Sequence, residues 1–458
     1  MSVALYDSFL YGSLFSDPDT VKLFSDSERV QAMLSVESAL AEVQGDLRII
    51  PSQAADEIVC ATRTLKPDFD ALQSGTEQAG FPIIALTSQL KSAVSQETAH
   101  YIHWGATTQD IMDTALILQL KEGLTLFERS LDRVIEHLGN LADLHRNTLM
   151  AGRTHSQQAL PITFGYKVAG WLAPLLRHRM RLTEMRPRLC VVQFGGAAGT
   201  LAALGEQGME VMEHLAKKLT LELPLVPWHS QRDAFAELAN WLSLITGSLG
   251  KLAQDVILLS QSEINEIRES SHSDRGGSST MPQKSNPILS EMIVACARMN
   301  ATLLSNMHHA LIAEQERATH GWQLEWLTLP QMFSCTGAAL NHANKVAESL
   351  VINDQQMQFN LDRANGLLLA EAATFALSEF LPRSEAQRLV KSACLETAEN
   401  GRHLMDILAE QSKINEIDWQ AMKNPAQYLG MCSVFVDRVL DSLSKSRPNK
   451  CKGSETES

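Results

Sequence analysis

Apolar residues recur along this chain mostly at the spacing of a helix. Between residues 235 and 259 they alternate at intervals of three and four, which is a repeat of roughly 3.5 residues. This seam consists of Phe235, Leu238, Leu242, Ile245, Leu249, Leu252, Val256 and Leu259. Alternation with a period of two, which would indicate strands, is scarce. The pattern predicts a long amphipathic helix here and an all-α fold for the chain.

Four more stretches show the same helical spacing. A second seam consists of Leu116, Leu120, Leu124, Phe127, Leu131, Val134, Leu138 and Leu141. A third helix is marked by Met292, Met299, Leu303, Met307 and Leu311, and residues 162–185 and 326–352 are also apolar-rich. A helix of about 25–30 residues is about 40 Å long, whereas about a dozen residues is the usual length. We therefore predict a long-helix bundle whose seams also pack against helices of other subunits.

The chain is expected to form three helical domains. Residues 1–105 make an N-terminal domain, residues 106–353 make the central long-helix bundle, and residues 354–458 make a C-terminal domain that begins at Asn353-Asp354. A short strand-like piece, Cys190–Phe194, is followed by glycines and is a candidate for a small hairpin.

Composition and charge narrow the class of partner. The chain has 458 residues, 45% hydrophobic and 20% charged, as in ordinary globular proteins. Its net charge of −14 argues against nucleic acid or an anionic membrane as partner, although a local cationic pocket can still bind a small anion. We see no long apolar run for a membrane span, no secretory signal and no targeting address. A cytoplasmic protein is the expectation.

Cysteine and glycine patterns argue against metal and cofactor sites. The seven cysteines are scattered without metal-ligand spacing, which predicts reduced thiols rather than a disulfide framework or a zinc site. Neither a nucleotide P-loop, a dinucleotide fingerprint nor an HExxH motif is present. We therefore expect no cofactor and no metal.

The most distinctive polar stretch, residues 268–286, lies between two predicted helices. It contains Gly276, Gly277, Ser278, Ser279, Lys284 and Asn286. A loop of this length is uncommon unless it is a lid or a binding loop. Asn286 and Pro287 suit a helix start, so the positive end of the following helix would face the loop beside Lys284 and favour an anion. A flexible surface connector is the alternative.

Three other segments are candidates for chemistry. In residues 152–161, His155 is either a general acid or base or a partly exposed structural histidine. In residues 103–110, Thr107 and Thr108 either offer hydroxyl and N–H groups to a carboxylate or belong to an ordinary capped helix start. In residues 228–233, Arg232 either clamps a carboxylate through two hydrogen bonds or pairs structurally with Asp233.

Three of these segments together resemble the active-site segments of the fumarase/aspartase superfamily. The matching residues are Gly277-Ser278-Ser279-Thr280-Met281-Pro282-x-Lys284-x-Asn286-Pro287, Thr154-His155-x-Gln157 and Gly105-Ala106-Thr107-Thr108-Gln109-Asp110. They occur in the family's order, and the resemblance runs from about residue 20 to about residue 440. Within the superfamily, the chain looks most like the 3-carboxy-cis,cis-muconate cycloisomerases, through Arg186–Leu189, Gln193–Ala197, Leu201–Gly205, Trp228–Asp233 and Tyr428–Gly430.

The resemblance implies an assembly and a mechanism. Family enzymes are homotetramers with a twenty-helix core, and each active site draws its three segments from three subunits. A base removes a proton next to a carboxylate, and the group on the neighbouring carbon then leaves. By resemblance, Ser278 is the base and His155 protonates the leaving group. The residues expected to bind a small polycarboxylate substrate are Thr107, Thr108, Thr154, Gln157, Arg232, Lys284 and Asn286.

Departures from the cycloisomerase pattern leave the reaction open. Those enzymes usually have tryptophan where this chain has His155, and histidine and arginine where it has Gln283 and Ser285. Gln283 is found in argininosuccinate lyases. The segments Glu314–Ala318 and Trp322–Trp326 also differ from the family. Loss of the loop arginine removes a cation suited to the three carboxylates of carboxymuconate, and His155 adds an acid suited to releasing an amine.

Three functions follow as alternatives. The first is a C–N lyase that cleaves a succinyl- or aspartate-derived substrate and releases fumarate or a related acid. The second is a 3-carboxy-cis,cis-muconate cycloisomerase of aromatic catabolism. The third is a structural homologue without catalytic activity.

Overall fold

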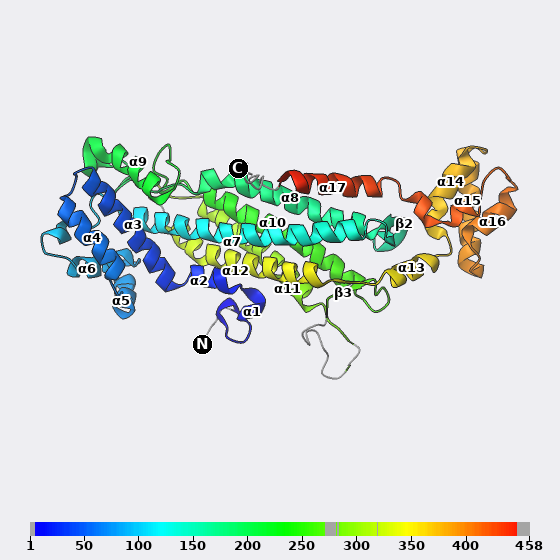
Figure 1. The fold of residues 1–458 in the computed structure, drawn as a ribbon, viewed down its shortest axis with the longest axis horizontal. Coiled ribbons are helices and arrows are strands. Elements are labelled where there is room, and N and C mark those ends of the chain that lie inside the picture. Colours follow the sequence, from blue (N-terminus) through cyan, green and yellow to red (C-terminus); the bar gives the residue numbers. More distant parts are fainter. Residues whose placement is uncertain (1–4, 271–280, 282–283, 318, 447–458) are drawn as a thin grey trace, which may run out of the picture. The chain divides into compact units, whose positions relative to one another are not determined.

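The computed structural model describes residues 5–270, 281, 284–317 and 319–446. Helices dominate these residues, which confirms the predicted all-α fold (Figure 1). Five helices are long: α7 (Thr108–Leu144), α8 (Phe164–Leu189), α10 (Asp233–Leu259), α11 (Ile288–Ala310) and α12 (His320–Ser349).

Shorter helices precede, interrupt and follow the long ones. The first six are α1 (Gly12–Phe15), α2 (Pro18–Leu23), α3 (Asp26–Asp46), α4 (Ser52–Thr64), α5 (Phe69–Ala79) and α6 (Ile83–Ser92). The others are α9 (Gly208–Leu219), α13 (Asp354–Asp362), α14 (Ala370–Ser378), α15 (Arg383–Asn400), α16 (Leu404–Ser412) and α17 (Cys432–Ser446). Short 3-10 helices are η1 (Leu5–Asp7), η2 (Thr98–Tyr101), η3 (Ala202–Gln207), η4 (Leu367–Leu369), η5 (Ala421–Lys423) and η6 (Pro425–Tyr428).

Strands among the described residues form two small antiparallel pairs. The strands β1 (Leu149–Thr154) and β2 (Gln157–Thr163) make a hairpin. The other pair, β3 (Ile267–Arg268) and β4 (Val351–Ile352), is two residues long.

Residue packing divides the chain into two compact units, and the three consecutive domains proposed from the sequence remain a prediction. Unit 1 consists of residues 1–130, 178–247 and 295–341, and unit 2 consists of residues 131–177, 248–294 and 342–458. The divisions fall inside the five long helices.

Unit 1 has its own hydrophobic core among the N-terminal helices. Ala41, Ile50, Ile58 and Leu90 are buried there, where α3 packs on α4. The unit 1 portions of the long helices are also bonded to one another, since Asn300 of α11 donates to Thr336 of α12 at 2.9 Å. Unit 2 has a second core, in which α14, α15 and α16 bury Leu377, Val390 and Leu408 among others.

The predicted helical seams are largely confirmed. All eight residues of the 235–259 seam are at most 3% exposed on α10. The third seam is wrong in part, because Met299 is 43% exposed, and the buried line of α11 instead includes Ile293, Cys296, Leu303 and Met307. A polar residue, Asn300, is fully buried within that line, so counting apolar residues missed the true face.

The predicted hairpin at Cys190–Phe194 is wrong. In the extended segment around Val191 only an isolated bridge forms, with Glu222. The N–H and C=O groups of Gln193 are bonded instead to the Thr114 hydroxyl, at 2.9 and 2.8 Å. A side chain of α7 therefore satisfies this backbone in place of a second strand.

Among the described residues, two helices, α10 and α11, are long and apolar enough to cross a membrane by length and composition alone. Core helices of soluble proteins meet the same criterion, and 44% of the apolar window of α10 and 33% of that of α11 are buried inside the fold. The observation is therefore weak evidence for a membrane span.

Candidate active site

The first motif segment lies in unit 1, at the start of α7. Thr108 is the first residue of the helix, and the backbone N–H of Thr107 donates to Asp110 at 2.9 Å. Thr107 and Thr108 are both half-buried. The segment is therefore a capped helix start, as one alternative proposed, and it still presents two hydroxyl groups at a helix N-terminus.

Asp110 ties this helix start to two distant segments of unit 1. Its fully buried carboxylate accepts the backbone N–H groups of Gly195 and Gly196, each at 2.9 Å. It also contacts the Nε2 of buried His229 at 2.7 Å. Because so many donors converge on it, Asp110 fixes the position of the Thr107–Thr108 step.

The loop before Thr107 is held by α3. His103, which has a positive φ of 65°, contacts Glu37 through Nδ1 at 2.6 Å, and Gln44 donates to the carbonyl of Trp104 at 2.8 Å. Burial disfavours a charged imidazole, but the charge and hydrogen bond of Glu37, with a contribution from Asp110, outweigh it and raise the pKa of His103. The loop therefore carries a protonation-dependent anchor.

Arg317 is a candidate site residue that the sequence reasoning missed. Its Nη1 donates to the Thr107 hydroxyl at 2.9 Å, so a half-buried guanidinium lies beside the predicted carboxylate-binding threonine. The two residues are 210 positions apart, and no spacing rule connects them. A cation here suits a carboxylate ligand.

Arg232 does not fit its predicted role as a substrate-binding residue. Its side chain is 1% exposed, and it donates to Asp113 at 2.6 Å through Nη1 and to Glu325 at 2.8 Å through Nε. The structural alternative was also wrong about the partner, since Asp233 takes no part in these bonds. The fork that would clamp a substrate carboxylate is already filled by two carboxylates of the chain.

The buried group formed by Arg232, Asp113 and Glu325 contains more carboxylates than cations. Asp113 and Glu325 face one arginine, and burial raises the pKa of Glu325 despite the opposing effect of Arg232. Asp113 is further bonded to the indole N–H of Trp322 at 2.9 Å. The network joins α7, α12 and the start of α10 within unit 1.

The second motif segment forms the tip of the β1–β2 hairpin in unit 2. Thr154 pairs with Gln157, and His155 and Ser156 form the turn between them. Both turn residues have positive φ, 47° and 64°, as in the type I′ turns of tight hairpins. All four side chains are exposed. A left-handed conformation costs about 1–3 kcal/mol per non-glycine residue, so the surroundings must hold this turn.

The third motif segment surrounds the start of α11 in unit 2. Ser278, the predicted base, lies outside the described residues, as does Gln283. Lys284 is exposed and Asn286 is half-buried before the helix begins at Ile288.

The predicted anion site at the start of α11 is already occupied by Glu269. This carboxylate accepts the backbone N–H groups of Leu289 at 3.2 Å and Ser290 at 2.7 Å, and the Ser290 hydroxyl at 2.6 Å. The following N–H, of Glu291, bonds to the carbonyl of Pro287. Glu269 therefore caps the helix from across the loop, where the sequence had suggested Asn286 as cap and a free helix end for a ligand.

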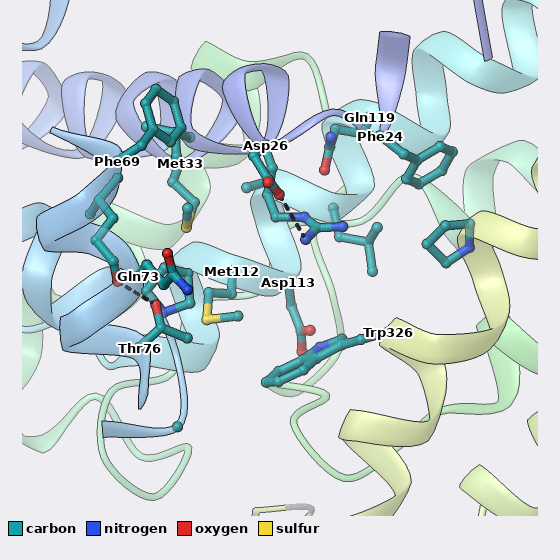
Figure 2. A pocket seen from close by; sticks show the side chains of 18 of the residues that line it. Phe24, Asp26, Met33, Phe69, Gln73, Thr76, Met112, Asp113, Gln119 and Trp326 are labelled. Atoms are coloured by element: carbon teal, nitrogen blue, oxygen red, sulfur yellow. Dashed lines mark hydrogen bonds and ion pairs between the residues drawn. The ribbon is translucent and has the colours of Figure 1, made fainter. Parts of the chain in front are cut away.

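A cavity of about 490 Å³ lies elsewhere in unit 1, between α3, α5, α7 and α12 (Figure 2). Its walls include Met33, Met112 and Trp326, and none of its described lining residues belongs to a motif segment. Two of its lining carboxylates, Asp113 and Glu325, are bonded to Arg232. The cavity is thus separate from the candidate active site.

Within one chain, the structure brings only some of the predicted residues together. Thr107 and Thr108 lie in unit 1, together with Arg317. The hairpin tip in unit 2 carries Thr154, His155 and Gln157. Lys284 and Asn286 also belong to unit 2, at the start of α11. Among the described residues, no hydrogen bond or ion pair joins the hairpin tip to Lys284 or Asn286. Groups of at least three potential metal ligands are also absent from the described part of the chain.

Comparison with known proteins gives matches over most of the chain. Residues 15–299 match a protein family described as "Lyase", and residues 366–439 match one described as "Adenylosuccinate lyase C-terminus". Among solved structures, 3-carboxy-cis,cis-muconate lactonizing enzyme from Pseudomonas putida is similar with a TM-score of 0.91 at 39% identity, covering 96% of this chain and 99% of that chain.

Three curated proteins illustrate the range of reactions among its relatives. The chain is 42% identical to trans-aconitate decarboxylase 1 of Mycosarcoma maydis, over 94% of this chain and 89% of that protein. It is 41% identical to 3-carboxy-cis,cis-muconate cycloisomerase of Pseudomonas aeruginosa, over 94% and 95%. It is 34% identical to N-acetyl-S-(2-succino)cysteine lyase of Dickeya dadantii, over 96% and 98%.

Proposed function

The chain belongs to the fumarase/aspartase superfamily of lyases, and we propose that it eliminates an amine or a similar heteroatom group from a succinyl- or aspartate-derived substrate. The products are fumarate, or a related unsaturated acid, and the free amine. The observation that carries this proposal is His155, an exposed imidazole at the tip of a tight hairpin. A histidine there supplies the proton that a poor leaving group requires.

The proposed reaction balances in two proton transfers. Ser278, as its alkoxide, takes the proton from the carbon next to a carboxylate and becomes a neutral hydroxyl, and the electrons of that C–H bond form the double bond. The C–N bond then breaks with its electron pair on nitrogen, and His155 donates a proton to that nitrogen. The carboxylate beside the reacting carbon carries extra negative charge during the reaction, so positioned donors and cations lower the barrier.

The remaining predicted residues take binding roles in this proposal. Lys284 and Asn286 hold the carboxylate whose charge increases. Thr107 and Thr108, with the Arg317 guanidinium beside Thr107, hold the second carboxylate. Thr154 and Gln157 flank the acid and orient the leaving group. Arg232 has no binding role, because its donors are used within the fold.

We also propose that the enzyme is a cytoplasmic homotetramer that builds each active site from three subunits. The long helices carry exposed apolar side chains that suit helix contacts with other copies: Leu244 and Leu258 on α10, Met299 on α11 and Leu327 on α12. The six described cysteines are free thiols, in keeping with a reducing compartment. Mixing a Ser278→Ala variant with a His155→Ala variant tests the shared site, because mixed tetramers regain some intact sites. Absence of any recovered activity after subunit exchange would contradict it.

A second candidate function is the cycloisomerisation of 3-carboxy-cis,cis-muconate. Identity of 41% to an enzyme of that name favours it. Ser285, where those enzymes have arginine, opposes it because one cation for a tricarboxylate is lost.

A substrate panel decides between the candidates. Purified protein is incubated with N-succinyl compounds, S-succinyl thiols, 3-carboxymuconolactone and trans-aconitate, and the products are identified by NMR. Fumarate from the succinyl compounds alone supports the proposal. Turnover of the lactone alone would establish the cycloisomerase instead, and CO₂ release from trans-aconitate alone would establish a decarboxylase. The Ser278→Ala variant is the control for turnover by a contaminant.

A further inference from the structure

The hairpin that carries His155 is held at its base by a buried acidic residue. Arg153, two positions before His155, donates to Glu266 through Nη1 at 2.8 Å and through Nη2 at 2.6 Å. The Glu266 side chain is fully buried and that of Arg153 is 18% exposed. Such a two-bond pair of planar groups fixes orientation as well as distance.

The opposite strand is anchored to the same group. Gln158 is the cross-strand partner of Arg153, and its amide donates to the carbonyl of Asn360 at 3.4 Å. The Asn360 side chain in turn donates to Glu266 at 2.9 Å. Both strands, directly below the turn, are thus tied to one pair of residues in unit 2.

Glu266 is itself held at both of its backbone groups. Its N–H donates to the carbonyl of Leu259 at 3.0 Å, and its carbonyl accepts the N–H of Asn353 at 2.9 Å. Lys167 lies near enough to interact with it electrostatically, and burial lowers the pKa of that lysine, with Asp255 opposing the shift. The anchor therefore belongs to the folded frame of unit 2 rather than to the hairpin.

We propose that Glu266, acting through Arg153, is a positioning residue for His155. The turn residues His155 and Ser156 both occupy left-handed conformations that favour glycine or asparagine. The sequence of the turn alone does not favour that geometry. The Arg153–Glu266 pair at the base of the hairpin therefore keeps the imidazole where it meets the leaving group. This proposal rests on the proposed function, in which His155 is the acid.

Glu266→Gln tests the anchor, because it keeps the shape of the side chain and removes its charge. Arg153→Lys is the second variant, which keeps the charge and loses the fork. Arg146→Lys is the matched control: Arg146 is also an ion-paired arginine of unit 2, bonded to Asp143 and Asp437. Circular dichroism and gel filtration establish that each variant folds and assembles.

Hydrogen–deuterium exchange gives a readout that needs no substrate. Both anchor variants should exchange faster across residues 149–163, and Arg146→Lys should exchange like the wild type. Unchanged exchange in the hairpin of a folded anchor variant would overturn the proposal, whatever the enzyme's substrate is. If Glu266→Gln does not fold, Arg153→Lys decides the same question.

Kinetics on two N-substituted aspartates tests the link to His155. One substrate releases unsubstituted aniline, a poor leaving group, and the other releases a nitroaniline, a better one; neither nitrogen is protonated at neutral pH. Loss of positioning should lower kcat on the aniline adduct on the order of 10- to 100-fold and should slow the nitroaniline adduct less, with KM little changed. Adding Glu266→Gln to His155→Ala should cause no further loss. Additive losses would overturn the proposal while leaving the proposed function intact. If His155→Ala slows neither substrate, the acid role in the proposed function fails, and with it the link to His155.

Discussion

Arg317 donates a hydrogen bond to the hydroxyl of Thr107 across 2.9 Å, which places a cation at the start of the longest helix of the chain. The positive end of the helix dipole lies there as well. The guanidinium and the hydroxyl together are our candidate for binding a substrate carboxylate in unit 1. Both residues are half-buried.

Substitution of Arg317 should weaken substrate binding. A hydrogen bond from a charged group is worth about 1.5–3 kcal/mol, so Arg317→Ala should lower kcat/KM by about 10- to 100-fold, mainly through KM. Thr107→Val should show a smaller loss, and Thr107→Ser should restore activity because it keeps the hydroxyl. Arg63→Ala, at an exposed position of unit 1, is the control. A wild-type kcat/KM in Arg317→Ala would remove this residue from the site.

The His103–Glu37 contact should make stability depend on pH. The folded state raises the pKa of His103, so the stabilisation is complete below the ordinary pKa of about 6.5 and is lost as pH rises through the raised value. Asp110 and Lys91 also act on this imidazole, in opposite directions. Glu37→Gln should therefore cost about 1–3 kcal/mol at about pH 5.5 and less at about pH 9.

Urea unfolding at the two pH values measures this difference. Glu42→Gln is the matched control, because Glu42 pairs with Lys218 at the surface and no histidine contributes to that pair. The free energy of unfolding lost through Glu37→Gln should decrease from the lower to the higher pH. If this loss is the same at both pH values, His103 is uncharged in the fold.

The sequence predicted the long helices well because their burial is periodic. It also located Thr107 beside a helix start. The hairpin around His155 was not predicted, because tight hairpin turns usually have the sequence Asn-Gly and this turn is His155-Ser156. The ion pair between Arg153 and Glu266 could not be predicted either, because the two residues are 113 positions apart in the sequence.

Long-range charge pairs explain the errors at the site. The sequence suggested either a substrate or Asp233 as the partner of Arg232, because only neighbouring residues can be recognised as partners in a sequence. Its actual partners, Asp113 and Glu325, are 119 and 93 residues away and leave no periodic trace. Glu269 likewise reaches across 21 residues to cap α11 and fills the site that had been predicted for an anion.

The Arg232 network predicts an asymmetry between two substitutions. Arg232→Met leaves Asp113 and Glu325 buried together without a cation, which should cost about 3–5 kcal/mol at neutral pH. Glu325→Gln leaves Asp113 paired with Arg232, so it should lower the free energy of unfolding by less. In the methionine variant, loss of the Arg232 charge raises the pKa of Glu325 further, so the stability of the variant should fall as pH rises from about 5 to about 7.5. Urea unfolding measures both effects. Equal costs for the two variants would show that the excess charge does not matter.

Removal of the Glu269 cap should open an anion site that the wild type lacks. Glu269→Ala frees the N–H groups of Leu289 and Ser290, and loss of such a cap costs about 0.5–2 kcal/mol. A free helix N-terminus binds phosphate or sulfate, so phosphate should restore part of the lost stability in the variant. Phosphate also stabilises proteins generally, so the gain must be compared with those of the wild type and of Glu263→Ala, at a nearby exposed position. Thermal unfolding across a phosphate series measures it. An equal gain in all three proteins would mean that the helix end is not freed by the substitution.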